Sequence, residues 1–224
     1  MKFFPIALFV LTCLFSAVAS AEKQPTTEKE KFSYAIGVQL GQTIARQNIE
    51  IDLDSFLQAI KDIVTSTPLK VSVEDMQKAM ISARDKEMKK QDEAGAANRI
   101  EGEKFLAENK TREGVVSVPG GLQYKVLKQG DGEKPSPDST VVVHYRGTLL
   151  NGKEFDSSYS RGEPLALNLK QVIKGWQIAL PMMQTGSKWQ LYVPSDLAYG
   201  AQAAGPDIGP NSTLIFDIEL ISIK

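Results

Sequence analysis

The stretch Thr140–Ser158, "TVVVHYRGTLLNGKEFDSS", brings together the residue types of nucleophilic catalysis. It holds His144, the only histidine of the chain, and Asp156 with Ser157 follows a short distance on. A serine hydrolase needs a histidine within hydrogen-bonding reach of the serine and a carboxylate that orients the histidine. One hypothesis is therefore a hydrolase that uses His144 as its general base.

The strand pattern around His144 argues against a hydrolase. His144 is followed directly by Tyr145 in an alternating segment, so their side chains point to opposite faces, and His144 faces away if Tyr145 faces the core. The chain also contains no G-x-S-x-G nucleophile elbow. With one histidine, the single cysteine Cys13 and no carboxylates at ligand spacing, we expect neither a metal nor another cofactor.

A second set of residues suits chemistry that needs no acid, base or metal. Aromatic side chains stand beside polar or glycine residues at Tyr145, Phe155, Trp176, Tyr199 and Phe216. Each of them alone could be an ordinary core residue. Their joint spacing favours a shared apolar pocket.

The elements that must position these aromatic residues are mostly strands. Period-2 alternation, typical of half-buried strands, runs through "LQYKVLKQG", "TVVVHYRG", "PLALNL", "KWQLYVP" and "TLIFDIELISI". Asn151-Gly152 predicts a two-residue hairpin turn, because both positions tolerate positive φ. One short helix is expected in "QVIKGWQIAL", ended near Ala179 by Pro181. We therefore expect a twisted antiparallel sheet wrapped around one short helix.

Four motifs carry a resemblance to a known family: "VVVHYRGTLLNGKEFDSS", "VIKGW", "VPSDLAYG" and "NSTLIFDIELISI". In their order and spacing, residues 115–224 resemble the FKBP-type peptidyl-prolyl cis-trans isomerases. The preceding "KFSYAIGVQLG" and "FLAENKTREGV" resemble the bacterial macrophage infectivity potentiator (Mip) subgroup. In that subgroup the N-terminal helices form a V-shaped homodimer and a long helix carries the isomerase domain.

The resemblance implies a proline-accepting pocket. Its walls and floor would be Tyr145, Phe155, Trp176 and Phe216, joined by Val172 and Ile173. Asp156 and Tyr199 would make polar contacts to the carbonyl region of the substrate, and the Ile173 backbone N–H would donate a hydrogen bond to the bound chain. Ile208 matches an apolar position of the loop over the pocket mouth.

Three positions depart from the family pattern. Leu165, which we also expect to bind substrate, stands where the archetype has phenylalanine, and Ala204 stands where it often has histidine. Asp207 lies beside Ile208 where a second apolar residue is usual. These departures bear on substrate preference and on the affinity for a macrolide ligand.

The implied function is acceleration of X-Pro isomerisation during the folding of secreted or envelope proteins, with proline-containing polypeptides as substrates. The alternative is a chaperone or host-protein-binding module in which isomerisation is incidental. A net charge of -1 and a pI near 6.0 give no basic excess for nucleic acid.

Residues 1–21 are expected to be a secretory signal peptide. Lys2 precedes the apolar run "FFPIALFVLTCLF", and Ala19-Ser20-Ala21 is a cleavage signal. The run is shorter than the roughly 20 residues of a membrane span. We therefore expect an exported chain without a transmembrane span after cleavage, in the periplasm or associated with the outer membrane or cell surface.

The segments between the signal peptide and the sheet read as helices. Phe32, Ile36, Leu40 and Ile44 lie on one stripe of a helix over 28–47. A shorter helix follows, capped by Asp52 or Asp54, and Ser72 opens a helix of about 40 residues.

This long helix has few apolar residues in its middle, where Gly95 and Gly102 each weaken it by about 1 kcal/mol. It is therefore expected to be a solvated stalk, free between the first helices and the next domain. So small a helical unit favours a homodimer, with a monomeric helical subdomain as the alternative. The expected regions are 22–71 for helical dimerisation, 72–114 for the connecting helix and 115–224 for the isomerase domain, an α+β arrangement.

Overall fold

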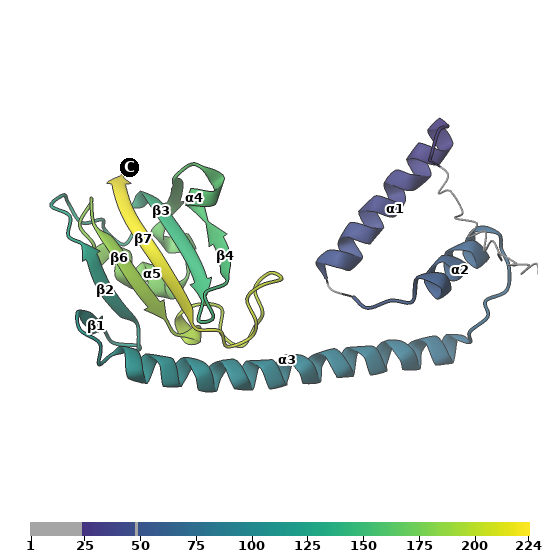
Figure 1. Cartoon of the computed structure of the whole chain (residues 1–224), viewed down its shortest axis with the longest axis horizontal. Coiled ribbons are helices and arrows are strands. Elements are labelled where there is room, and N and C mark those ends of the chain that lie inside the picture. Colours follow the sequence, from purple (N-terminus) through teal and green to yellow (C-terminus); the bar gives the residue numbers. More distant parts are fainter. Residues whose placement is uncertain (1–23, 48) are drawn as a thin grey trace, which may run out of the picture. The chain divides into compact units, whose positions relative to one another are not determined.

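The computed structural model describes residues 24–47 and 49–224 (Figure 1). The chain divides into two compact units between Ile51 and Asp52. The predicted signal peptide, residues 1–21, lies outside the described residues.

The first unit is built on helix α1, Glu28–Arg46. A capping box fixes its start, because the Thr27 side chain accepts from the Glu30 N–H and the Glu30 carboxylate accepts from the Thr27 N–H at 2.9 Å. The helix expected over 28–47 is therefore confirmed. None of its residues is buried, and Phe32 on the apolar stripe is 68% exposed.

The second unit begins with two further helices whose starts also follow the sequence pattern. Asp52 caps α2, Leu53–Val64, by accepting from the Ser55 N–H at 2.8 Å. Ser72 caps α3, Val73–Asn109, by accepting from the Asp75 N–H at 3.0 Å. Helix α3 is continuous over 37 residues, as expected.

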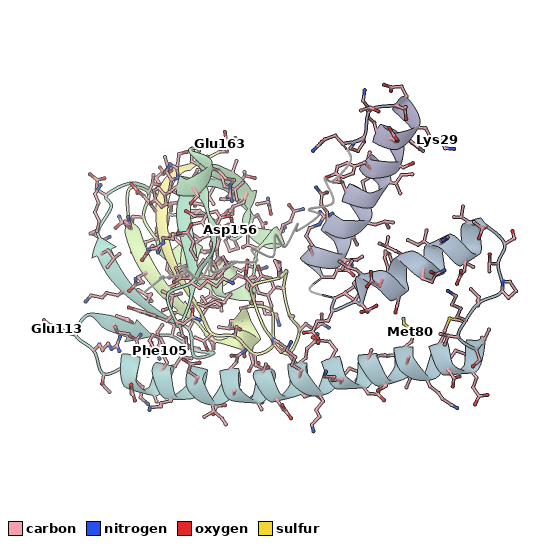
Figure 2. The ribbon with its side chains drawn as sticks, turned by 45° about the vertical axis from the view of Figure 1, so that its right-hand side comes forward. Lys29, Met80, Phe105, Glu113, Asp156 and Glu163 are labelled. Carbon is pink, nitrogen blue, oxygen red and sulfur yellow. The ribbon has the colours of Figure 1, made fainter. Side chains whose placement is uncertain are left out.

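The expectation that α3 is a free stalk up to the next domain is wrong for its C-terminal half. Gly95, Gly102 and Asn109 are its buried residues, and they recur every seven positions on one face of the helix. Figure 2 shows Phe105 where this part of α3 meets the sheet domain, and its ring lies 5.9 Å from that of Tyr192. The two glycines that weaken the helix are thus the places where it approaches the sheet domain most closely.

The sheet domain follows α3 and confirms the α+β fold. Its strands are β1 (Val115–Ser117), β2 (Gln123–Lys128), β3 (Thr140–Leu149), β4 (Glu154–Ser157), β5 (Leu165–Asn168), β6 (Lys188–Val193) and β7 (Leu214–Ile223). They pair antiparallel in the order β1-β2-β6-β7-β3-β4, with β5 also paired to β3. Helix α5, Lys174–Ala179, lies against this sheet (Figure 1), and Trp176 joins the apolar side chains of β3 and β7 in one core.

The strand faces follow the alternation of the sequence on β3 and β7 and depart from it on β2 and β6. Val141, Val143 and Tyr145 of β3 are buried on the core face, as expected. Gln123 of β2 departs from the alternation: it is buried next to the buried Leu122, because α3 covers it. Its side-chain N–H donates to the Leu106 carbonyl at 2.8 Å, and its side-chain oxygen accepts from Asn109 at 2.9 Å.

The hairpin between β3 and β4 forms, but with a different turn from the one expected. The Gly152 N–H donates to the Leu149 carbonyl at 2.9 Å, and only Gly152 of the Asn151-Gly152 pair has positive φ, at 83°. This is a three-residue loop in which glycine supplies the left-handed position. Asn151 instead accepts from the Lys153 N–H through its side chain.

The helical pieces of the sheet domain exceed the single one expected. Helix α5 ends at Ala179 and a 3-10 turn, Leu180–Met182, takes up Pro181, as predicted. The structure adds helix α4, Ser158–Arg161, and two further 3-10 turns. Helix α4 is too short to show helical periodicity in a sequence.

Candidate active site

A cavity of about 550 Å³ opens between α5, the β3–β4 hairpin and β5. Apolar and aromatic side chains form most of its wall. The residues that line it are Thr140, Tyr145, Phe155, Asp156, Leu165, Ala166, Leu167, Asn168, Gln171, Val172, Ile173, Trp176, Tyr199 and Phe216. A volume of this size accepts a short peptide segment.

Four aromatic rings meet edge to face around this cavity. Trp176 lies 5.3 Å from Tyr145 and 5.2 Å from Phe216 between ring centroids, with interplanar angles of 78° and 82°. Phe155 lies 5.6 Å from Phe216 at 87°. Edge-to-face contacts at these distances stabilise each ring against its neighbour, so the walls of the cavity are rigid.

The sheet register brings these rings together. Gly147 of β3 is opposite Phe216 of β7 and Asp156 of β4. A Cβ atom at Gly147 would lie 2.6 Å from the Phe155 ring and 2.9 Å from the Phe216 ring. The missing side chain of Gly147 is therefore what lets the two phenylalanine rings touch.

One side of the cavity carries a charged network. The Tyr145 hydroxyl donates to Asp156 Oδ2, while Arg161 donates to Asp156 Oδ1 and, at 2.8 Å, to the Tyr145 oxygen. Burial alone would raise the pKa of Asp156, but the hydrogen bonds from Tyr145 and Arg161 lower it below its usual value. Burial and the bond to Asp156 raise the pKa of Tyr145. The site thus holds a carboxylate and a neutral phenol at neutral pH.

Arg161 is a site residue that the sequence did not single out. Helix α4 carries it back toward β3. Ser157 caps the start of the helix by accepting from the Ser160 N–H, and Gly162 caps its end with φ 79°. An arginine shortly after Ser157 and Ser158 gives no sequence signal by itself. The local "SSYSRG" pattern of cap residue and C-terminal glycine could have pointed to the short helix.

A histidine–serine pair of the kind that a serine hydrolase uses is present, but its role is structural. His144 Nδ1 lies 2.9 Å from the Ser158 hydroxyl. Ser158 is fully buried, accepts from the Tyr145 N–H at 2.8 Å and donates to the Tyr145 carbonyl at 3.1 Å. A serine that is sealed from solvent and tied to the strand backbone cannot attack a substrate, so Ser158 fixes α4 to β3.

The structure brings nine of the ten expected site residues into the cavity wall. Ile208 is the exception: it is 6% exposed, belongs to the core and pairs with Ala204 in a bridge. Five lining residues were not expected, namely Thr140, Ala166, Leu167, Asn168 and Gln171. Four of them lie on β5 or shortly after it in the chain, and a strand of four residues is too short to show a clear alternation of apolar and polar residues.

Asp207, which departs from the family pattern, has a structural partner. Its carboxylate forms an ion pair with Lys153 of the β3–β4 turn at 2.7 Å. The pair is partly exposed and stabilises by no more than about 1 kcal/mol. It joins the loop near the cavity to the hairpin that carries Phe155.

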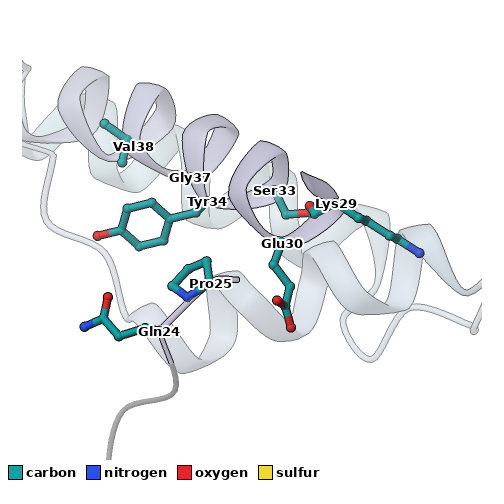
Figure 3. Close-up of a pocket in the computed structure, with 8 residues that line it drawn as sticks. All are labelled: Gln24, Pro25, Lys29, Glu30, Ser33, Tyr34, Gly37 and Val38. Carbon is teal, nitrogen blue, oxygen red and sulfur yellow. The ribbon is translucent and has the colours of Figure 1, made fainter. Parts of the chain in front are cut away.

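A separate hollow of about 710 Å³ lies along α1, in the first unit. Figure 3 shows its lining residues, Gln24, Pro25, Lys29, Glu30, Ser33, Tyr34, Gly37 and Val38. It lies along one helix, and the four edge-to-face rings and the charged network belong to the cavity of the sheet domain. We therefore place the candidate chemistry in the cavity of the sheet domain.

No helix in the described ranges is long and apolar enough to cross a membrane.

Comparison with known proteins agrees with the geometry. Residues 131–221 match the family model of the FKBP-type peptidyl-prolyl cis-trans isomerases, and residues 29–126 match the model of the domain amino-terminal to such isomerases. The chain is 40% identical to the outer membrane protein MIP of Legionella longbeachae, over 100% of this chain and 98% of that protein. The chain belongs to the FKBP-type peptidyl-prolyl cis-trans isomerases.

Other relatives of this FKBP-type isomerase give the same assignment. The peptidyl-prolyl cis-trans isomerase Mip of Coxiella burnetii is 38% identical over 94% of each chain. The crystal structure of FkpA from Escherichia coli superposes with a TM-score of 0.64 at 34% identity, covering 89% of this chain and 98% of that one. The chain is therefore an enzyme of the peptidyl-prolyl isomerase class, with the helical region and the sheet domain of its relatives.

Proposed function

We propose that the cavity around Trp176 is where this isomerase binds and rotates the X-Pro bond of its substrates. The observation that carries the proposal is the edge-to-face aromatic box, in which Trp176 contacts both Tyr145 and Phe216. A proline ring is flat, apolar and compact, so it suits a box of this kind. The charged network on one side leaves the rest of the box apolar.

Rotation about a peptide bond crosses a barrier of about 18–20 kcal/mol, because amide resonance is lost. The twisted amide is less charge-separated than the planar one, so an apolar surrounding disfavours the planar state relative to the twisted state. Lowering the barrier by about 5 kcal/mol would accelerate rotation a few thousandfold. X-Pro bonds are suitable substrates, since their isomers differ by only about 0.5–1 kcal/mol and interchange slowly.

Polar groups at the edge of the box would orient the substrate. Asp156 presents a fixed negative charge, which repels the carbonyl oxygen of a planar amide that approaches it. The Tyr199 hydroxyl lines the same cavity and can donate to a substrate carbonyl. Ile173 lines the cavity at the start of α5, and its backbone N–H is proposed to donate to the bound chain.

The two tryptophans of the chain provide a matched test. Trp176 and Trp189 are each 5% exposed, but only Trp176 lines the cavity, whereas Trp189 stacks on Tyr124 at 4.2 Å. Trp176→Leu should lower kcat/KM for an X-Pro peptide about tenfold or more, and Asp156→Ala should also lower it. Trp189→Leu should leave kcat/KM nearly unchanged in the folded fraction. Equal rates for Trp176→Leu and the unsubstituted chain would overturn the proposal.

The proposed substrates are proline-containing polypeptides that fold after export. The relative from Legionella longbeachae is named as an outer membrane protein. We infer from this an envelope location for this chain, in the periplasm or at the outer membrane or cell surface. A macrolide that fills an apolar box is a proposed inhibitor. Leu165 is smaller than the phenylalanine of the family archetype and is 39% exposed, which favours weaker macrolide binding.

We also propose a homodimer formed through the N-terminal helices, as in the Mip subgroup. The stripe of Phe32, Ile36 and Leu40 on α1 is 45–68% exposed. A single chain would leave these side chains in water, and burying each one stabilises by about 1.5–3 kcal/mol. A second copy of the same helix supplies a matching apolar face.

The apolar face of α2 favours a second candidate function, the holding of unfolded chains. Leu53, Leu57, Ile63 and Val64 are 60–77% exposed on this helix. A holding function predicts that Trp176→Leu still suppresses the aggregation of an unfolded client. If aggregation suppression is absent in the unsubstituted chain, this second function is excluded.

A further inference from the structure

The C-terminal half of α3 lies directly against the segment that leads into β7. A Cβ atom at Gly102 would lie 2.2 Å from Thr213 Oγ1, and one at Gly95 would lie 3.1 Å from Pro210 Cβ. Asn98 donates to the Pro210 carbonyl at 2.8 Å. A glycine inside a helix is unfavourable by about 1 kcal/mol relative to alanine, and this close approach gives both glycines a structural reason.

Asn211 of this segment makes hydrogen bonds both to α3 and to the loop that contains Gly200. Its side-chain N–H donates to the Gly95 carbonyl of α3 at 3.2 Å. Its backbone N–H donates to the Gly200 carbonyl at 2.8 Å. Its φ of 54° is in the left-handed region, which asparagine tolerates better than most residues.

Gly200 directly follows Tyr199, which lines the cavity. The bond between Asn211 and Gly200 therefore closes a loop, residues 199–211, that begins at the cavity wall. Inside the loop the Ala204 N–H donates to the Ile208 carbonyl at 2.8 Å. Tyr199 itself is 44% exposed, so backbone bonds rather than core packing hold it in place: this closure, and the bond from the Gly200 N–H to the Ser195 carbonyl at 2.9 Å.

We propose that Asn211 is a positioning residue that couples α3 to Tyr199, so that docking of the long helix sets how well the cavity mouth holds a polypeptide. The inference rests on the proposed isomerisation site. The rings of the box, such as Trp176 and Phe216, are fixed by α5 and β7 and do not depend on this contact. Loss of the coupling therefore weakens substrate binding and spares the rotation step.

The test uses Asn211→Gly in the full chain without residues 1–21. Glycine accepts the positive φ but removes the side-chain bonds of Asn211 to the Gly95 carbonyl and to Arg99. The bond from Asn98 to the Pro210 carbonyl remains, so the loop is held to α3 less tightly, without backbone strain. Exchange NMR with an X-Pro peptide gives KM and kcat separately. We expect KM to rise about three- to tenfold and kcat to stay within about twofold.

A second readout does not depend on activity. Amide hydrogen exchange at Gly200 and Ala204 should become about tenfold faster in Asn211→Gly, because the loop opens more often. If amide exchange becomes faster in Asn211→Gly but neither this variant nor the unsubstituted chain isomerises the peptide, the proposed function fails and the coupling between α3 and the loop stands. Unchanged exchange would overturn the coupling, whatever KM does, as would faster exchange in an active enzyme with an unchanged KM.

Gln123→Ala is the matched control. It removes the bond from Gln123 to the Leu106 carbonyl and thus frees the end of α3 farther from Asn211. We expect lower stability with KM and the exchange of Gly200 unchanged. Equal KM increases in Gln123→Ala and Asn211→Gly would show a general effect of helix docking and would overturn the specific role of Asn211.

Discussion

Strand β4 presents two carboxylates, each paired with an arginine, and only one of the pairs faces the cavity. Asp156 bonds Arg161 beside the aromatic box, whereas Glu154 bonds Arg146 at 2.7 Å outside it. Arg161 therefore orients the site carboxylate and the Tyr145 hydroxyl, and its removal should lower kcat/KM about three- to tenfold in Arg161→Gln. Arg146→Gln breaks the equivalent surface pair and should change kcat/KM less than twofold. Equal effects in a peptide isomerisation assay would contradict the role of Arg161.

The pH dependence of the isomerase follows from the same network. Burial raises the pKa of Asp156, but the hydrogen bonds from Tyr145 and Arg161 outweigh burial, so the pKa of Asp156 is lowered overall. Burial and the hydrogen bond to Asp156 raise the pKa of Tyr145. Neither group changes charge between about pH 5 and 9, so kcat/KM should be flat there. The stabilisation from Asp156 is complete above its unfolded pKa of about 3.9 and is lost as the pH falls through the lower folded pKa. A large loss of kcat/KM in His144→Ala would instead support a catalytic His144.

At the residue scale, the sequence predicted the aromatic wall but not the group that orients its carboxylate. Strand alternation predicts that Tyr145 and Phe216 are buried, and Trp176 lies in the short helix that the sequence also predicts. Arg161 depends on a four-residue helix that turns the chain back, which is a tertiary feature. Ile208 shows the converse limit: an apolar loop residue was expected at the mouth and is instead packed in the core.

Strand β3 determines how closely the rings of the box can meet. Gly147→Ala would place a methyl group against the Phe155 and Phe216 rings, which must then separate. We expect kcat/KM to fall about tenfold, since displacements near 1 Å at a reacting site are costly. Gly152→Ala is the control, because its Cβ meets nothing within 4 Å although its φ is 83°. That substitution should cost about 1 kcal/mol of stability in urea unfolding and leave kcat/KM unchanged; equal activity in both variants would contradict the tight box.

Helix α3 shows why a helix can be predicted while its partner is not. Capping by Ser72 and the absence of proline until Pro119 predict its length from local chemistry. The buried residues of the docking face are Gly95, Gly102 and Asn109, with Phe105 as an apolar contact, and hydrophobic periodicity does not detect a face with so few large apolar side chains. Close backbone approach and side-chain amide bonds replace hydrophobic burial there, so the stretch resembled a solvated stalk in sequence.

The whole molecule is expected to be a dimer whose two cavities act independently on a short peptide. The cavity lies within residues 140–216, whereas the proposed dimer contact lies on α1. A substitution that breaks the dimer should therefore leave the isomerisation of a peptide unchanged. Ile36→Asp places a charge in the middle of the apolar stripe, and burying that charge in an interface is strongly unfavourable. The chain without residues 1–21 should have a dimeric mass by light scattering at micromolar concentration, and Ile36→Asp should halve it.

Peptide kcat/KM per chain should stay within about twofold in Ile36→Asp, because a short peptide needs only one cavity. Gln42→Asp introduces the same charge on the opposite face of α1 and should keep the dimeric mass. Large unfolded clients differ from a peptide, since two linked cavities raise the effective concentration of each site for the other. Ile36→Asp should therefore slow the refolding of a proline-limited protein client more than it slows peptide isomerisation. A monomeric mass for the unsubstituted chain would remove the basis of this difference, and equal slowing of both substrates would show that the cavities do not cooperate.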